Sequence, residues 1–400
     1  KLVAGGRYRP MSLIVFALVY ELFGPFAFIY HLLSIIAYAC LGLVMFTLLR
    51  RLFSQRFQQH AIPFAFLASA LFIAHPVHTE CVANIKGMDE TLALLFSMLG
   101  FHQFLLYIDE KRKSHLLFAG LFLFAGMLSK ENAITYLAII PLAALLFRNI
   151  SFSQIIRPLA LLAGFALFFL LLRANSLGFN PFNKLSQELM NNPFLKVNNG
   201  LVEPMSFLEK AGIISYCLFE YLRLLIWPHP LTHDYYPKQI PMLGIYSFQS
   251  IAAMLFYSLA TFYSIQKFRK VPEAFFSWAA FVLPLFLVSN ILFPVGTNMG
   301  ERFLFMPSFG FVVGLVFFLQ RWNGGNWSRV SFQLCPVLII FSILTIVRNP
   351  VWHDNMTLFK GDLKTSARSA KIHNAVGGVL LEDLPKTKDT AEIRRILVKA

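Results

Sequence analysis

Long apolar runs separated by short polar interruptions dominate the chain. A membrane span needs about twenty apolar residues to cross a hydrocarbon core of about 30 Å. Runs that reach or approach this length cover residues 27–49, 62–74, 92–108, 116–128, 134–147, 156–172, 251–265, 274–292, 303–319 and 334–347. They predict an all-α polytopic membrane protein with about ten transmembrane helices. The shorter run 11–23 is followed by Gly24 and Pro25 and predicts a helix on the membrane surface.

Composition strengthens this prediction and excludes one class of partner. Hydrophobic residues make up 57% of the chain, charged residues only 14%, and the mean hydropathy is +0.62. A soluble protein of 400 residues needs more polar surface than this. The net charge of +15 comes from short basic clusters between apolar runs, without a continuous phosphate-tracking surface, so we expect no nucleic-acid partner. The four cysteines show neither a CxxC motif nor metal-ligand spacing.

The basic clusters predict which loops face the cytoplasm, because cytoplasmic loops carry an excess of Lys and Arg. These clusters are Arg50, Arg51 and Arg56; residues 111–113; Arg148 with Arg157; residues 267–270; and Arg321 with Arg329. Residues 7–10, 75–90, 129–132, 175–246 and 293–301, and everything after Arg348, then lie on the exoplasmic side. Asp109, Glu110 and Glu273 are the main acids left on the basic side.

This assignment of loops to the two sides of the membrane requires that the run 213–227 does not cross it. Glu220, Arg223 and the following Pro228 favour a re-entrant or surface helix there. If the run does cross, every later loop changes sides.

The chain changes from apolar to polar near its end, and this change predicts two domains. Residues 1–347 would form the multi-span domain, and residues 348–400 an exoplasmic tail. The segment 369–377 followed by Leu380 has the spacing of a tetratricopeptide-like helical hairpin, and one such repeat cannot bury its own apolar face. We therefore expect further repeats to follow, and further chain to precede Lys1.

The densest polar cluster holds His75, His78, Glu80, Lys86, Asp89 and Glu90. It interrupts two apolar runs on the exoplasmic side, where polar groups are costly and usually functional. The alternative for Asp89 and Glu90 is that they only begin the next helix, whose dipole favours acids there.

Three further interruptions carry candidate chemistry. Lys130 and Glu131 lie between two runs and suit either a local ion pair or a phosphate contact. His233, Asp234 and Tyr235 lie in a proline-rich loop that suits either a sugar or a plain lid. Glu301 and Arg302 begin a run, where Arg302 suits either a phosphate or an interfacial anchor. His75 and His78 lack an evident third ligand, so we expect no metal site.

These motifs, in this order, resemble the transmembrane and tetratricopeptide-repeat protein family, and the segments 8–10 and 30–32 also match its pattern. The family is similar to protein O-mannosyltransferases of the GT-C fold. The resemblance covers essentially the whole chain. It implies transfer of a sugar, typically mannose, from a polyprenyl-phosphate carrier to a protein Ser or Thr hydroxyl on the exoplasmic face, without an obligate cofactor. Met88 departs from the family, which usually has Arg there, and the family's catalytic acid is expected upstream of Lys1.

The remaining residues suit that chemistry, because a hydroxyl nucleophile needs a carboxylate base and a leaving phosphate needs fixed cations. We expect Glu80, Asp89 and Glu90 to be catalytic. Donor phosphate would bind Lys86, Lys130, Arg302 and Arg9. Substrate would bind His75, His78, Glu131, His233, Asp234, Tyr235 and Glu301.

Other functions remain open at this point. A transporter or flippase would carry ionisable residues near mid-membrane and inverted repeats, which are not evident here. A membrane-anchored interaction module would need fewer spans, and an enzyme could instead use a lipid or glycan acceptor. The expected partners are membrane lipids, the lipid-linked donor and a protein acceptor that the tail could engage. High Phe, Lys and Asn usage favours a bacterial inner membrane with a periplasmic active face, the endoplasmic reticulum being the alternative.

Overall fold

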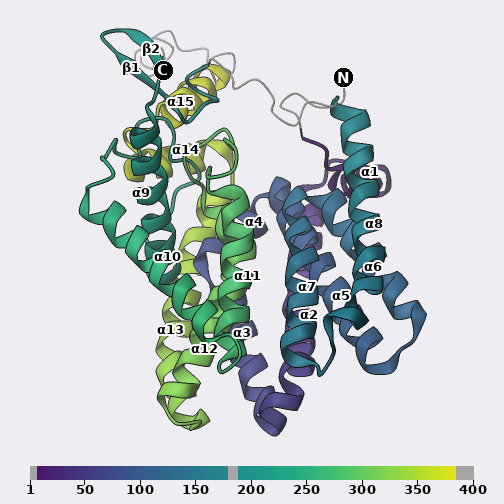
Figure 1. The fold of residues 1–400 in the computed structure, drawn as a ribbon. Helices are drawn as coiled ribbons and strands as arrows, with labels where there is room; N and C mark the ends of the chain where they lie inside the picture. The colour runs from purple at the N-terminus through teal and green to yellow at the C-terminus, as the bar shows by residue number, and fades with distance from the viewer. Residues whose placement is uncertain (1–6, 179–187, 384–400) are drawn as a thin grey trace. The chain divides into compact units, whose positions relative to one another are not determined.

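A computed structural model describes residues 7–178 and 188–383. Within these ranges it is predominantly helical, with one short β-hairpin (Figure 1). Six segments are long and apolar enough to cross a membrane: Ala27–Ala74, Ile85–Glu110, Phe152–Leu177, Phe248–Lys267, Glu301–Trp322 and Trp327–Trp352. Pro10–Phe23, Lys113–Ser129, Glu131–Phe147 and Pro272–Val288 are shorter apolar helices. The prediction of an all-α polytopic membrane protein is confirmed.

Contacts divide the described chain into two compact units. Unit 1 holds residues 7–178, 260–285 and 305–342, and unit 2 holds residues 188–259, 286–304 and 343–383. The predicted tail thus shares a unit with residues from the middle of the chain. The predicted domain boundary at residue 347 stays a prediction.

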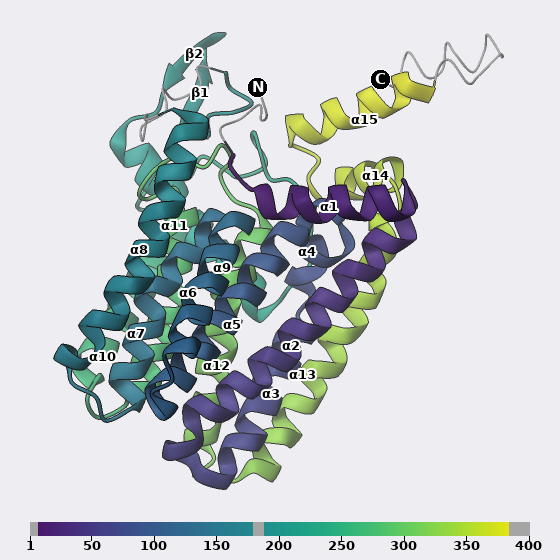
Figure 2. The same ribbon diagram turned by 90° about the vertical axis from the view of Figure 1, so that its right-hand side faces the viewer.

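Unit 1 is a helical bundle. Its helices are α1 (Pro10–Phe23), α2 (Ala27–Phe57), α3 (Ala61–Ala74), α4 (Thr79–Ala83), α5 (Met88–Glu110), α6 (Lys113–Ser129), α7 (Tyr136–Phe147), α8 (Phe152–Leu177), α12 (Phe305–Trp322) and most of α11 (Pro272–Val288). Short 3₁₀ turns connect several of them: η1 (Gln58–His60), η2 (Pro76–His78), η3 (Ile85–Gly87) and η4 (Glu131–Thr135). The helix α1 runs crosswise to α2 (Figure 2), and the prediction that it lies on the membrane surface stays open.

The core of unit 1 is built from aromatic and aliphatic side chains. Phe53 packs edge-on against Phe64 and Phe147, with ring centroids 4.8 and 5.0 Å apart. Such packing matters in a membrane, where lipid is as apolar as the side chains and helices associate through close contact. Gly310 of α12 shows how close: an added Cβ would lie 2.5 Å from the carbonyl carbon of Ala280 in α11.

Unit 2 holds a hairpin, one long helix and a helical pair. The strands β1 (Leu195–Asn198) and β2 (Leu201–Pro204) are antiparallel and join at Asn199 and Gly200, which both have positive φ. Unit 2 also contains α9 (Phe207–Ile226), η5 (Glu301–Leu304), η6 (Asn349–Trp352), α14 (Asn355–Thr365) and α15 (Ala370–Asp383). Both units share α10 (Phe248–Lys267) and α13 (Trp327–Arg348).

Two predictions about unit 2 remain open. The helix α9 is not among the segments long and apolar enough to cross a membrane, which agrees with the expectation that 213–227 does not span. The pair α14 and α15 forms a helical hairpin at the predicted place, but a tetratricopeptide repeat is not established, and residues 384–400 lie outside the described range.

Charged residues gather at the two ends of unit 1. At one end Asp109 binds Arg51 and Arg148, with N–O distances of 2.9 and 2.7 Å, and Glu273 binds Arg56 at 2.7 Å. The acids that were exceptions on the basic side are therefore neutralised by arginines. At the other end lie the segments that contain Arg9, residues 75–90 and residues 129–132. The sidedness of these ends is still a prediction.

Candidate functional site

Arg9 brings two predicted site acids together in unit 1. It directly precedes α1, Asp89 lies in the first turn of α5, and Glu131 begins η4 after α6. The Arg9 guanidinium lies 2.5 Å from an Asp89 oxygen and 3.0 Å from a Glu131 oxygen. All three side chains keep between 15% and 26% of their surface exposed, so solutes can still reach them. We call Arg9, Asp89, Glu131, Glu90 and Lys130 the ion-pair cluster.

Lys130 and Glu90 form its buried half. Lys130 has extended backbone after α6, which directs its side chain to Glu90 one residue beyond Asp89. They are 4% and 1% exposed, respectively, and pair with each other. A buried charge without a partner would be costly, so this pairing stabilises both ions.

Glu80 and Lys86 lie on the short elements between α3 and α5. Glu80 is on α4 and is 4% exposed, whereas Lys86 is on η3 and its side chain faces solvent. Among the described residues, Lys86 makes no ion pair. Gly87, directly after Lys86, packs against α4, since an added Cβ would lie 2.7 Å from the Glu80 carbonyl oxygen and 2.8 Å from Cys81 Cα. Of the predicted cations in unit 1, Lys86 is the most available to a ligand.

His75 and His78 are buried in unit 1, at 1% and 2% exposed. The His78 ring bridges two helices, with Nδ1 2.8 Å from the Tyr38 hydroxyl of α2 and Nε2 2.9 Å from the Ser308 hydroxyl of α12. Burial, and then the neighbouring His75, lower the pKa of His78 well below its ordinary value of 6.5, which favours the neutral ring. These contacts give His78 a structural role, and its predicted role in substrate binding has no support here.

Glu301 organises a second cluster, in unit 2, which we call the Glu301 cluster. One Glu301 oxygen accepts hydrogen bonds from the Thr232 backbone N–H at 2.5 Å and from the Tyr235 hydroxyl at 2.8 Å. Glu301 is 1% exposed. Burial, and then Glu301, raise the pKa of Tyr235 well above its ordinary value of 10, so the hydroxyl stays a donor at physiological pH.

His233 and Asp234 connect the same loop to the tail. The backbone N–H and Nδ1 of His233 lie 2.7 and 2.9 Å from one Asp362 oxygen, and Arg348 binds the same carboxylate at 2.5 Å. Burial alone would raise the pKa of Asp362, but the bonds from His233 and Arg348 lower it to about 2. Asp234 accepts bonds from the Tyr236 backbone and the Ser369 hydroxyl. Both side chains therefore hold the loop against α14 and α15.

Arg302 belongs to unit 2 and is half-buried, with its guanidinium 5.6 Å from the Phe303 ring centroid. In the described part of the chain, no three His, Cys, Asp or Glu side chains lie close enough to hold a metal ion. Sequence reasoning missed Tyr38, Ser308, Arg348 and Asp362. Tyr38 and Ser308 were hidden inside apolar runs, whereas a buried acid in a polar tail gives no signal before the fold is known.

Comparison with known proteins finds relatives that match nearly the whole of this chain at 26–29% identity. A protein O-mannosyl-transferase of Caenorhabditis elegans is 29% identical over 392 residues, which cover 96% of this chain and 52% of the relative. Protein O-mannosyl-transferase TMTC4 of Homo sapiens is 26% identical over 423 residues, covering 97% and 57%. Protein O-mannosyl-transferase Tmtc3 of Drosophila melanogaster is 26% identical over 438 residues, covering 93% and 46%.

The chain spans about half the length of these curated relatives. No family model matches it, and no solved structure matches it. The relatives come from animals, whereas composition favoured a bacterial source. Over nearly its whole length the chain is similar to protein O-mannosyl-transferases, which confirms the family resemblance that its motifs carry.

Proposed function

We propose that this chain forms the membrane part of a glycosyltransferase that moves mannose from a polyprenyl-phosphate carrier to a Ser or Thr hydroxyl of a protein, on the exoplasmic side. The observation that carries the proposal is the similarity to protein O-mannosyl-transferases over nearly the whole chain. The acidic and cationic side chains at one end of unit 1 support it, because both kinds of group are needed for this chemistry.

The reaction breaks one bond and forms one. The acceptor hydroxyl oxygen attacks C1 of the mannose, the bond from C1 to the phosphate oxygen breaks, and polyprenyl phosphate leaves with the bonding electrons. A carboxylate takes the hydroxyl proton. Fixed cations stabilise the negative charge that develops on the phosphate.

The surroundings of each side chain rank the candidates for these roles. Lys86 is exposed and has no acid partner among the described residues, so we assign it to the donor phosphate. Arg9 is held between Asp89 and Glu131 and acts as a positioning residue for both carboxylates. Asp89 and Glu80 are the candidate bases, in addition to any acid contributed from outside this sequence. Lys130 is already neutralised by Glu90, which makes it the weaker phosphate ligand.

Mannose transfer from radiolabelled polyprenyl-phosphate-mannose to protein in isolated membranes tests the proposal directly. The full-length protein should transfer label, and Lys86→Gln should lower kcat/KM about tenfold or more, the effect of losing one charged contact to the phosphate. Glu80→Gln, Asp89→Asn and Arg302→Ala should each lower transfer as well.

Lys113→Gln is the matched control, because Lys113 is also exposed and lies at the opposite end of unit 1. Its transfer should equal that of the parent protein. If the full-length protein transfers none of several lipid-linked sugars to protein, the enzyme proposal fails. Transport of the intact lipid-linked sugar would then favour a flippase, and transfer to a lipid or glycan would correct only the acceptor.

A further inference from the structure

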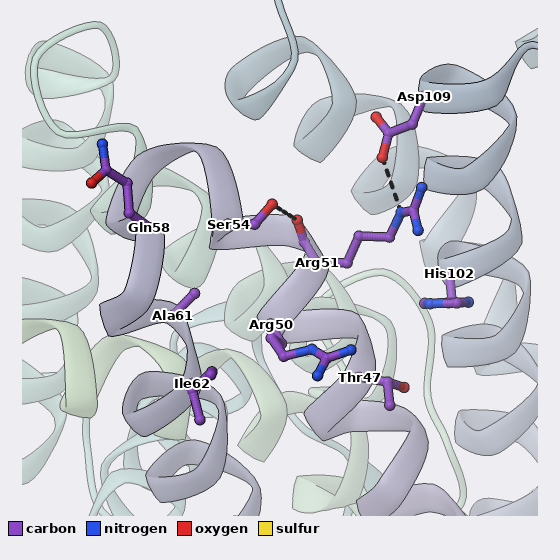
Figure 3. Close-up of a pocket in the computed structure, with 9 residues that line it drawn as sticks. All are labelled: Thr47, Arg50, Arg51, Ser54, Gln58, Ala61, Ile62, His102 and Asp109. Carbon is purple, nitrogen blue, oxygen red and sulfur yellow. Dashed lines mark hydrogen bonds and ion pairs between the residues drawn. The ribbon is translucent and has the colours of Figure 1, made fainter.

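A cavity of about 750 Å³ lies at the basic end of unit 1 (Figure 3), and no residue of the ion-pair cluster lines it. It is lined by Thr47, Arg50, Arg51, Ser54, Gln58, Ala61, Ile62, His102 and Asp109. From this cavity we infer a binding pocket for a phosphate group, of a lipid headgroup or of a free phosphate. The inference does not depend on the proposed function.

The sequence positions of the lining residues explain why the cavity is polar. Thr47, Arg51 and Ser54 are three or four residues apart and therefore share one face of α2, and Gln58 follows directly after the end of that helix. His102 and Asp109, seven residues apart, share one face of α5. Figure 3 shows the Arg51 side chain directed toward Asp109, and the His102 ring on the same neighbouring helix.

The charges around the cavity do not cancel. Arg51 binds Asp109 at 2.9 Å and Glu110 at 3.4 Å, and Arg148 also binds Asp109, at 2.7 Å. These two arginines and two acids neutralise one another. Arg50 adds a further positive charge, and in the described part of the chain no acidic oxygen lies within ion-pair distance of it.

Arg50 is also well prepared to bind an anion. Its guanidinium is exposed and lies 6.0 Å from the centroid of the Phe46 ring, one turn earlier on α2. A guanidinium offers paired N–H donors that match a phosphate group, and aromatic contact leaves those donors available. The Thr47 hydroxyl and the His102 ring add polar groups on two sides of the cavity.

The opposite wall is apolar and favours a lipid as the source of the phosphate. Ala61 and Ile62 begin α3, and Ile62 is 52% exposed. Basic pockets between transmembrane helices are known sites for anionic headgroups, with the acyl chains along the apolar surface. The cavity follows directly after the apolar run 27–49 of α2, at the level expected for headgroups.

Native mass spectrometry of the full-length protein in detergent, titrated with dioleoylphosphatidic acid, tests this pocket. Arg50→Gln should weaken lipid binding about tenfold, the effect of one charge-assisted contact. Arg157→Gln is the matched control, since it removes the same charge from an exposed site at the start of α8, outside the cavity. It should change the affinity less than about twofold.

Further measurements identify the source and exclude a folding artefact. Displacement of the lipid by inorganic phosphate would support a pocket that takes the phosphate group alone, and failure to displace it would support a lipid headgroup. Arg50→Lys, which keeps the charge without the paired donors, should bind with intermediate affinity. Equal losses in Arg50→Gln and Arg157→Gln, or equal binding of dioleoylphosphatidylcholine, would overturn the inference.

Discussion

Asp362 carries a negative charge with none of its surface exposed. Its carboxylate binds Arg348 and His233. Asp362 therefore connects α14 with the end of α13 and with the loop after α9. We expect Asp362→Asn to lower the stability of the folded state by about 3 kcal/mol, because it leaves the Arg348 guanidinium, only 11% exposed, without its carboxylate partner. Thermal unfolding of the purified protein in detergent would measure the loss.

Asp354→Asn is the control for that measurement. Asp354 caps α14 but is about half exposed, so its replacement should cost about 1 kcal/mol or less. Similar losses for the two variants would contradict a special role for the buried carboxylate.

The pKa of Asp362 gives the same contact a defined pH dependence. Its pKa falls from an ordinary 3.8 to about 2 on folding, so the ionised carboxylate stabilises the folded state above pH 4. We expect this contribution to be lost as the pH falls through about 2. Unfolding temperatures measured between pH 5 and pH 2 should therefore decrease in the parent protein and decrease less in Asp362→Asn.

At the scale of single residues, the sequence predicted which residues belong to the charged clusters better than it predicted which side chains pair with one another. Lys86, Asp89, Lys130 and Glu131 were singled out because charges interrupted apolar runs. The structure brings Asp89 and Glu131 together through Arg9, and Lys130 to Glu90. Those pairings join residues up to 122 positions apart, and local sequence contains no information on such distances.

Helix contacts give a prediction at the scale of elements. Gly310 of α12 lies against the backbone of Ser277, Ala280 and Phe281 in α11. A methyl group there would collide with backbone atoms that cannot rotate away, so Gly310→Ala should lower stability by about 1–3 kcal/mol. Thermal unfolding in detergent would measure it.

Gly164 provides the matched control, because it lies within α8 and an added Cβ there meets no atom within 4 Å. Gly164→Ala should leave stability unchanged or raise it by about 0.5–1 kcal/mol through helix propensity. If Gly164→Ala lowered stability as much as Gly310→Ala, the loss in Gly310→Ala would come from the backbone conformation of glycine and not from helix packing.

The apolar runs predicted most helices and their approximate limits. The hairpin of β1 and β2 was missed, although Asn199-Gly200 is a typical signal for a two-residue turn with positive φ. The flanking strands have only four residues each and lack strong alternation, which is why the turn alone did not predict them.

Membrane orientation is a property of the whole molecule. In a variant whose four cysteines are replaced, Lys86→Cys and Tyr246→Cys should react with an impermeant maleimide added to the exoplasmic side, since both positions are exposed. Gln59→Cys should react only after permeabilisation, because the Arg-rich end of unit 1 is expected inside. Labelling would be measured by gel shift.

Two outcomes would correct the topology differently. If Gln59→Cys were labelled without permeabilisation and Lys86→Cys only after it, unit 1 would have the opposite orientation in the membrane. Labelling of Tyr246→Cys only after permeabilisation, with Lys86→Cys labelled outside, would show that α9 crosses the membrane. Composition and hydrophobic runs predicted the fold class, whereas the number and direction of crossings depend on marginal helices such as α9.

The length of α2 has a consequence for the membrane around the protein. With 31 residues, α2 is about 46 Å long, well beyond the hydrocarbon thickness of about 30 Å. Even strong tilting leaves its last turns outside the hydrocarbon, and the tilt changes as the bilayer becomes thinner or thicker. The depth of Arg50 and Arg51 relative to the headgroups therefore varies with lipid chain length, so membranes of different thickness would present different parts of the basic end to their lipids.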